Sequence, residues 1–493
     1  MDFSWNYYAI LGVSPTASED DLRQAYRIAA RRFHPDVNKA PGANLLFQDI
    51  NTAYEVLSDQ RRRNEYDLVR RDRADGVSHL LIDVHYSRRV LKSLHEPQLL
   101  YVLAKVQPLL ETMTLKTDAP LNLCLVIDRS KSMAGGRMQH VKNAAYRIVD
   151  ECKPNDIISM VVFSDDAEVI VPAQRLTDPR SAKTMISTIR ADGATAILAG
   201  LRQGLAQLER FRASEYVNHL ILITDGRTYG DEAECMHVAA KARENGIGIS
   251  GMGIGEDWND RFLDALASQT GGSSTYINNV DAVAQFLHER IRSLATAYAE
   301  RSRLVATPAS DVRLNTITRL TPDAMTLPTD TQPIPLGVID GLSATTLLLQ
   351  FHVSTNGAEH GEFFVGRLDL SGEVLGTDQH IERATQDLTV EISDRDSEEN
   401  PPPELLDALS KLMLYRLQDR AREAIEKGDI GQATRSLEFL ATRLFEAGQE
   451  DLGQAALSEA ERVANTRVLS EEGVKRLKYG TRALLPLSGE QDG

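Results

Sequence analysis

Residues 121–133 read Leu-Asn-Leu-Cys-Leu-Val-Ile-Asp-Arg-Ser-Lys-Ser-Met, an apolar run that ends in a loop rich in side-chain oxygens. Further apolar runs of strand length follow at Ile157–Phe163, His219–Ile223 and Ile247–Ile254. Amphipathic helical stretches lie between them, at Met138–Glu151, Leu198–Arg210 and Ala233–Glu244. Apolar strands that alternate with amphipathic helices indicate a parallel sheet covered on both faces. The sequence therefore predicts a doubly wound α/β domain over residues 119–298, which should bind ligands beyond the carboxyl ends of its strands.

Oxygen-bearing side chains follow two of these strands and lie in one loop between them. Asp128, Ser130 and Ser132 come directly after the first strand. Thr195 ends the loop Asp192-Gly193-Ala194-Thr195, and Asp225 follows the strand His219–Ile223. The alternation Asp-x-Ser-x-Ser lets one tight loop direct three oxygens at a single point. Hydroxyls and carboxylates without His or Cys suit a hard cation, which predicts a site for Mg²⁺, or for Mn²⁺ or Ca²⁺.

This pattern resembles the metal-ion-dependent adhesion site of von Willebrand factor type A domains, and the likeness continues through Met133 and Gly135-Gly136 into the next helix. The resemblance implies that Ser130, Ser132 and Thr195 bind the metal directly. Asp128 and Asp225 would bind it directly or through water. A carboxylate of a protein partner would fill the open position, and Arg129 and Lys131 would favour such an acidic partner. Ala194 replaces a glycine that is common in the family, a small change that should preserve the site.

A second motif, His34-Pro35-Asp36, follows a basic amphipathic helix predicted over Asp20–Phe33. Proline cannot continue this helix, so the chain must turn and present the His and Asp side chains in an exposed loop. Ser18 begins a capping box at the start of the helix. Three arginines spaced four apart, Arg23, Arg27 and Arg31, form a cationic ridge that ends at the turn. A second amphipathic helix over Leu46–Leu57 completes an antiparallel helical hairpin.

This segment resembles the J-domain of the DnaJ family, from Tyr7-Tyr8-Ala9-Ile10-Leu11-Gly12-Val13 to Tyr66-Asp67. The resemblance implies that it docks on a DnaK-type ATP-driven chaperone and stimulates ATP hydrolysis. His34, Pro35 and Asp36 would carry that effect, and the ridge arginines would supply electrostatic docking. Ile28 stands where the family usually has a further cation, which weakens the ridge.

The flanks of the α/β domain differ from it in pattern. Residues 78–118 and 302–393 show apolar or alternating runs bounded by turn residues, which predicts strands. The first group is too short to bury a core alone, so we expect both groups to form one β-sandwich into which the α/β domain is inserted. After a linker at Ser393–Pro403, residues 402–480 form a C-terminal helical region, with helices predicted over Leu405–Glu426, Ile430–Glu446 and Leu452–Val463. A plain bundle packed on the sandwich is favoured over a peptide-binding groove. With a J-domain over residues 3–70, the chain is therefore predicted to be multidomain.

Composition limits the partners and the compartment. The net charge of −16 falls outside the first seventy residues, which argues against a nucleic-acid or anionic membrane partner. The three cysteines lie far apart and indicate neither a disulfide framework nor a zinc site. No secretory signal follows Met1–Ser4, and the apolar runs are too short to span a membrane, so we expect a cytoplasmic protein.

Together these features predict an adaptor co-chaperone that recruits a DnaK-type chaperone and holds a protein partner through a metal-bridged carboxylate. One alternative is an assembly scaffold that works with a ring-forming ATPase. Another is a metal-dependent hydrolase, because a metal with an open position can activate water. The motif supplies no general base, so we expect no enzyme.

Overall fold

The computed structural model describes residues 7–72, 79–109, 119–176, 178–227, 230–277, 282–356, 358–375, 381–395 and 400–486. Met1–Ser4, part of the linker Ser393–Pro403 and the outermost residues of several predicted domains lie outside these ranges. The chain divides into two compact units. The first comprises Met1–Leu115, Tyr298–Pro322 and Thr326–Leu406, and the second comprises Lys116–Ala297, Asp323–Met325 and Asp407–Gly493.

The first unit begins with a small helical domain, whose elements are α1 (Tyr7–Leu11), α2 (Glu19–Phe33), α3 (Ala43–Leu57) and α4 (Gln60–Asp72). The predicted capping box is present, because the Ser18 hydroxyl accepts from the Asp21 amide at 3.2 Å and the Asp21 carboxylate accepts from the Ser18 amide at 2.9 Å. Apolar faces of α2 and α3 meet around Phe33, Ile50 and Leu57, all almost fully buried. The helical hairpin predicted from the sequence is thereby confirmed.

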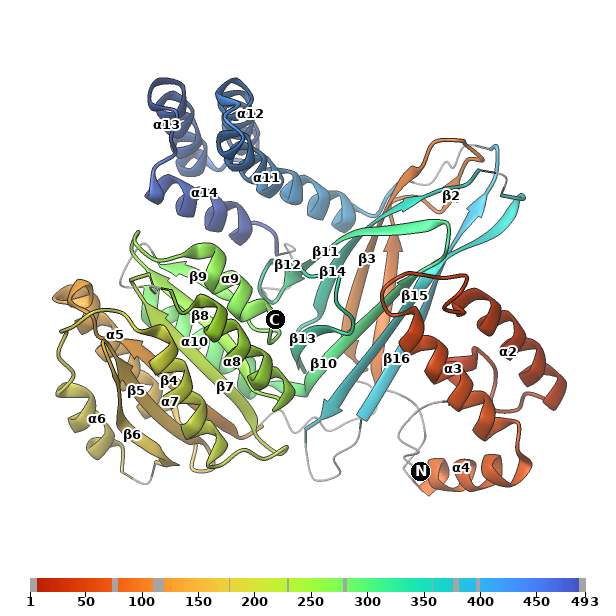
Figure 1. The fold of residues 1–493 in the computed structure, drawn as a ribbon, viewed down its shortest axis with the longest axis horizontal. Helices are drawn as coiled ribbons and strands as arrows, with labels where there is room; N and C mark the ends of the chain where they lie inside the picture. Colours follow the sequence, from red (N-terminus) through yellow and green to blue (C-terminus); the bar gives the residue numbers. More distant parts are fainter. Residues whose placement is uncertain are drawn as a thin grey trace. The chain divides into compact units, whose positions relative to one another are not determined.

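Two five-stranded sheets, which belong to this unit except for Ala297 and Met325, follow the helical domain (Figure 1). One has the strand order β1 (Leu80–Tyr86), β3 (Gln98–Pro108), β14 (Thr345–Val353), β11 (Val312–Thr321) and β12 (Met325–Leu327). The other has the order β13 (Ile334–Asp340), β10 (Ala297–Pro308), β15 (Gly361–Val374), β16 (Ile381–Ile392) and β2 (Val90–Leu91). Strand β3 pairs with β14, with Val102 opposite Leu349, although the whole α/β domain separates them in sequence. This pairing confirms that the α/β domain is inserted into the sandwich.

The second unit contains a six-stranded sheet of order β6-β5-β4-β7-β8-β9. Its strands are β4 (Leu121–Asp128), β5 (Ile157–Phe163), β6 (Ala167–Arg175), β7 (Val217–Thr224), β8 (Gly248–Ile254) and β9 (Ser274–Ile277). All pair in parallel except the edge strand β6, which runs antiparallel to β5. Strands β6 and β9 were not predicted from the sequence, because β6 is only partly buried and β9 has four residues.

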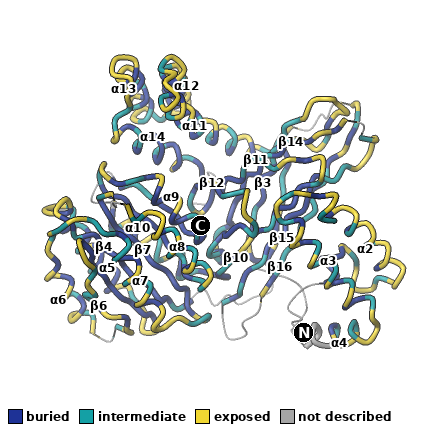
Figure 2. The backbone as a smooth tube through the Cα atoms, viewed as in Figure 1, coloured by how far each residue is buried: buried dark blue, intermediate teal, exposed yellow. Residues whose placement is uncertain are grey.

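Helices cover both faces of this sheet, as predicted. One face packs against α5 (Gly136–Glu151), α6 (Pro179–Ser187) and α10 (Ala282–Ala295). The other packs against α7 (Ile197–Glu209), α8 (Glu232–Glu244) and α9 (Asp260–Ser268). The central strands β4 and β7 are buried along their whole length (Figure 2). This rigid centre fixes the strand ends that carry Asp128 and Asp225.

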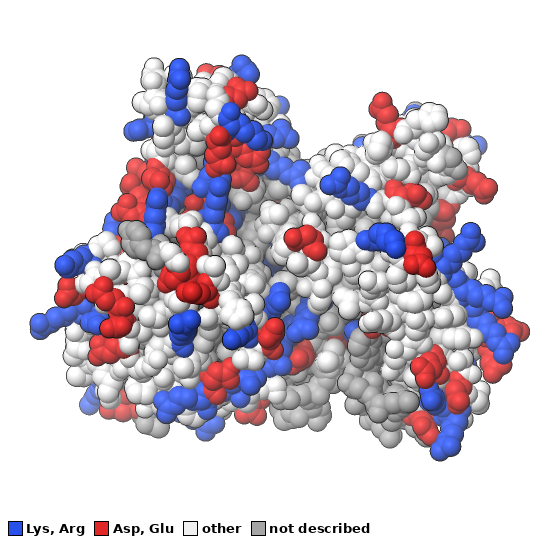
Figure 3. Space-filling model, in the orientation of Figure 1, with Lys and Arg blue, Asp and Glu red and all other residues white. Residues whose placement is uncertain are grey.

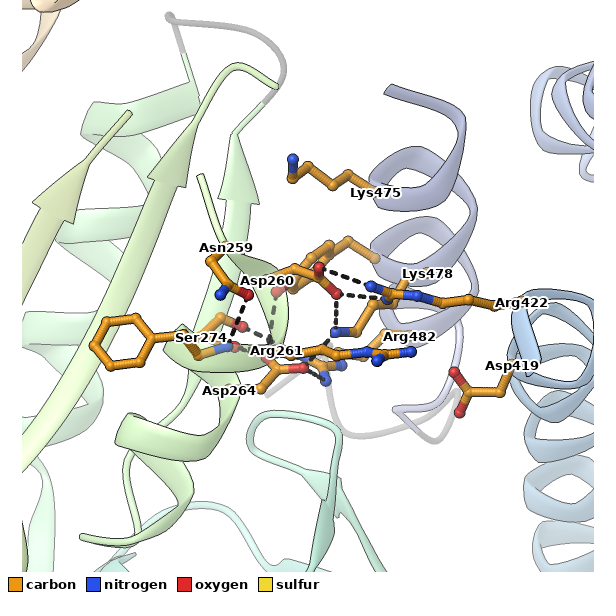
Figure 4. A network of polar contacts seen from close by, with 12 residues as sticks. Asn259, Asp260, Arg261, Asp264, Ser274, Asp419, Arg422, Lys475, Lys478 and Arg482 are labelled. Carbon is orange, nitrogen blue, oxygen red and sulfur yellow. Dashed lines mark hydrogen bonds and ion pairs between the residues drawn. The ribbon is translucent and has the colours of Figure 1, made fainter. Parts of the chain in front are cut away.

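Four helices end the described chain: α11 (Pro403–Glu426), α12 (Ile430–Glu446), α13 (Glu450–Thr466) and α14 (Glu471–Ala483). The sequence predicts that this bundle packs on the sandwich, whereas in the structure α14 packs on the α/β domain. Tyr479 joins the core on that face, with its ring 5.6 Å from that of Trp258. Beside it Asp260 and Asp264 bind cations of α14 and α11 (Figure 4). In the described residues, no helix is long and apolar enough to cross a membrane.

Two candidate binding sites

The first candidate site lies at the carboxyl ends of β4 and β7. These strands are neighbours in the sheet, with Ile127 opposite Ile223, so the residues that follow them come together. Asp128 and Asp225 are fully buried there, and Ser130 is nearly so. The loop from Asp192 to Thr195 closes over them through a bond from the Lys131 amide to the Gly193 carbonyl at 3.2 Å.

The predicted ligands form one hydrogen-bonded cluster. Asp128 accepts from the Ser130 amide at 2.7 Å and from the Thr224 hydroxyl at 2.6 Å. Ser132 donates its hydroxyl to Oδ1 of Asp225 at 2.7 Å, and the Ser130 and Ser132 hydroxyls are 3.0 Å apart.

Thr195 also lies at this cluster. Its hydroxyl would be 2.8 Å from a Cβ atom placed on Gly226, so only glycine at that position allows the approach. The structure therefore brings together all five residues that the motif singles out.

The chemistry of this cluster fits a hard divalent cation. Burial raises the pKa of Asp128, although hydrogen bonds from Thr224 and Ser130 partly offset it, and nearby Asp225 raises it further. A buried carboxylate in this condition gains from a neighbouring cation. In the described part of the chain, no three His, Cys, Asp or Glu residues gather as a metal site. A cation here would therefore depend on the hydroxyls of Ser130, Ser132 and Thr195 as well as the two carboxylates.

One cation that was not predicted from the sequence contacts this cluster. Arg137, in the first turn of α5, donates Nη1 to Oδ2 of Asp225 at 2.6 Å. Of the two cations expected beside the metal, the Arg129 guanidinium is 3.6 Å from Glu168, and the Lys131 side chain is 80% exposed. The sequence signal for this contact was the position of Arg137. A cation in the first turn of α5 opposes the helix dipole and therefore needs an anionic partner.

The second candidate site is the loop after α2. The carbonyl of His34 accepts from the Asn38 amide at 2.8 Å and forms the turn, while its Nδ1 accepts from the Asp36 amide at 3.1 Å. The imidazole packs edge-on against Phe47 with ring centroids 5.1 Å apart. The side chains of His34 and Asp36 are 44% and 85% exposed. The loop thus presents both side chains to solvent, as predicted.

The arginine ridge is also exposed. Arg23, Arg27 and Arg31 all lie on the open face of α2, and Figure 3 shows basic side chains gathered over this helix at the edge of the molecule. Arg23 is 3.6 Å from both Glu19 and Asp20, weak contacts for exposed ions that leave it available to a partner.

A different face of the helical domain is fastened to the sandwich. Arg367 of β15 donates to the Ile10 carbonyl at 2.8 Å, and Arg383 of β16 donates to Asp49 at 3.2 Å. Asn38, directly after the exposed loop, donates its side-chain amide to the Pro308 carbonyl at 3.0 Å. Phe364 packs against Phe33. These contacts, which were not predicted from the sequence, hold the domain while its ridge and loop stay exposed.

Comparisons with known families match three segments. The model described as DnaJ domain matches residues 6–67. The model described as von Willebrand factor type A domain matches residues 122–289. The model described as Sll0103-like, C-terminal alpha-helical domain matches residues 403–486.

Similar proteins match parts of the chain. An uncharacterized protein of Synechocystis sp., sll0103, is 30% identical over 217 residues, which are 43% of this chain and 51% of that protein. The chaperone protein DnaJ of Pediococcus pentosaceus is 53% identical over 62 residues, 13% of this chain and 17% of its own. The chain thus spans about half the first relative and a small part of the second. A solved structure, "von Willebrand factor type A from Catenulispora acidiphila", aligns with a TM-score of 0.64 over 82% of this chain and 96% of its own at 16% identity, a likeness of fold.

Proposed function

The chain is a J-domain joined to a von Willebrand factor type A domain, and we propose that it is an adaptor co-chaperone. Its J-domain stimulates a DnaK-type chaperone, and its metal site holds a protein partner through a carboxylate. The observation that carries the proposal is the joint exposure of His34, Asp36 and the α2 ridge on a domain fastened by another face. A chaperone can dock on that face without disturbing the sandwich contacts.

The metal half of the proposal, which is the binding of a partner through a metal ion, rests on the cluster at the ends of β4 and β7. Ser130, Ser132 and Thr195 would hold Mg²⁺ or Mn²⁺ with Asp128 and Asp225, and Ca²⁺ is a further candidate because all the donors are oxygen. The metal, when bound, supplies a positive centre that attracts a carboxylate. The Ser132 hydroxyl donates a hydrogen bond to Asp225, so a lone pair of its oxygen can still bind a cation.

We further propose that this site binds and does not catalyse. Its two carboxylates are both committed as ligands, and the cluster includes no His or Lys to act as general base. The acidic surface supports protein partners over nucleic acid or anionic membranes. The proposed location is the cytoplasm, where a DnaK-type partner would be available.

Mn²⁺ titration of the intact protein tests the metal half, with calorimetry as the readout. Asp128→Ala and Thr195→Ala should abolish binding without unfolding the sheet. Asp192→Ala is the matched control, because its exposed carboxylate lies in the same loop but outside the ligand set. Partner capture from a lysate should require Mg²⁺ or Mn²⁺ and stop in chelator. If the wild type binds no Mn²⁺ at millimolar concentration and capture ignores chelator, the metal half of the proposal is wrong.

A further inference from the structure

Arg137 occupies a place that the helix itself disfavours. It lies in the first turn of α5, where the unpaired amides already carry partial positive charge. Its guanidinium is nevertheless held closely, by Asp225 at 2.6 Å and by the Ser132 carbonyl at 3.3 Å. The Arg137 side chain is 35% exposed, whereas Asp225 is completely buried.

The end of β8 is shaped to admit this guanidinium. A Cβ atom on Gly255 would lie 2.7 Å from Nη2 of Arg137, so the guanidinium would have to shift from its place to admit any side chain there. Gly255 also has a φ of +71°, a backbone conformation that glycine tolerates best. A glycine at this position therefore provides both the turn and the space for Arg137.

The two oxygens of Asp225 have separate partners. Oδ1 accepts from Ser132, one of the proposed metal ligands, while Oδ2 accepts from Arg137. Arg137 therefore compensates the charge of Asp225 without contacting the proposed ligand hydroxyls. Asp128, held by Thr224 and Ser130, is then the only ligand carboxylate without a cationic partner among the described contacts of the cluster. With Arg137 in place, a divalent cation would leave one positive charge in excess. Without Arg137, the two carboxylates would balance that cation.

We propose that Arg137 is a positioning residue that sets the specificity of the metal site. It weakens the binding of a divalent cation alone and makes the occupied site prefer an anionic group at its open position. Metal and carboxylate then bind cooperatively, each raising the affinity of the other by the same factor. This inference rests on the proposed function, because it requires a metal at the cluster.

The test is Mn²⁺ binding to the intact protein, measured by water-proton relaxation with and without acetate at constant ionic strength. Arg137→Met should bind Mn²⁺ on the order of tenfold more tightly than the wild type in the absence of acetate, as expected for removing one nearby charge. Acetate should raise Mn²⁺ affinity in the wild type and do so much less in this variant. Because misfolding lowers affinity, a gain in affinity cannot arise from damage to the fold.

Two controls isolate the contact with Asp225. Arg137→Lys keeps the charge and should restore wild-type behaviour. Lys131→Met removes an exposed cation between two ligands and should leave Mn²⁺ affinity unchanged. Equal or weaker Mn²⁺ binding by Arg137→Met, or an equal gain in Lys131→Met, would overturn the inference while leaving the metal site standing. Absence of Mn²⁺ binding in all four proteins would overturn the metal site and this inference together.

Discussion

Changing Asp264 to Asn should detach α14 from the α/β domain. Asp264 accepts from Arg482 at 2.8 and 3.0 Å, from Tyr479 at 3.2 Å, and lies 2.7 Å from the Lys478 ammonium (Figure 4). Burial alone raises the pKa of this carboxyl, but the charges of Arg482 and Lys478 outweigh it and lower the pKa to about 2. The amide of Asn has similar shape and no charge, but its NH2 group would face the donors that one carboxylate oxygen now accepts from, so the substitution removes the charge together with those hydrogen bonds.

The loss of unfolding free energy caused by Asp264→Asn can be obtained in two ways. Removing one partner of a buried ion pair costs about 3–5 kcal/mol in unfolding free energy. The fall in pKa from 3.8 to about 2 corresponds to about 2 kcal/mol. We therefore expect a loss of about 2–4 kcal/mol. Because the folded-state pKa is depressed, the wild type keeps this stabilisation above pH 3.8 and loses it as the pH falls through 2. Asp264→Asn should lack that pH dependence.

Trp258 provides the assay, because it is buried and packs against Tyr479 of α14. In a Trp5→Phe background, its fluorescence during urea unfolding should report the release of α14, and circular dichroism should report global unfolding. Asp257→Asn, an exposed change of the same kind nearby, is the control and should have no effect. The reasoning is refuted if Asp264→Asn unfolds at the same urea concentration as the control or keeps the acid dependence of the wild type.

Two further predictions concern the attachment of the J-domain. Arg367→Met should cost about 1.5–3 kcal/mol of local stability by removing the charged bond to Ile10, and amide exchange across α2 and α3 should quicken. Exchange at β15 and β16 should quicken too, because the variant also loses the ion pair between Arg367 and Asp387; unchanged exchange across α2 and α3 would contradict this. Burial raises the pKa of Asp49 to about 6, although Arg383 lowers it. As the pH falls from 7 to 5, Asp49 therefore takes up a proton in the attached domain before it would do so when exposed to solvent, and the attachment should strengthen. Asp49→Asn should abolish this pH dependence, and an unchanged dependence in that variant would refute the assignment.

Local sequence patterns explain which parts of the fold and of the candidate sites could be predicted from the sequence. The alternation of buried strands and amphipathic helices identifies the α/β domain because parallel sheets are covered on both faces. Asp128 and Asp225 follow adjacent strands, so their meeting is a consequence of sheet topology. The loop at His34 is fixed by the proline that ends α2.

The packing of α14 and the attachment of the J-domain could not be predicted, because both depend on pairs of charged residues that are far apart in the sequence. Helix α14 has buried cations at Lys475, Lys478 and Arg482, which look like a solvated face until Asp260 and Asp264 are known to lie opposite. The sequence contains no local mark of that pairing. The same holds for Arg383 with Asp49, which are 334 residues apart in the chain. Burial of a charge depends on a partner that only the tertiary fold supplies.

The stimulation of ATP hydrolysis by a DnaK-type chaperone tests the proposed role most directly. Single-turnover hydrolysis should be measured with the wild type, with His34→Gln and with Asp128→Ala as a control whose change lies in the other unit. An exposed loop change should alter stability by no more than about 0.5 kcal/mol, so His34→Gln should stay folded. We expect stimulation by the wild type and by Asp128→Ala, and none by His34→Gln. Equal stimulation by folded His34→Gln, or none by the wild type, would contradict this expectation.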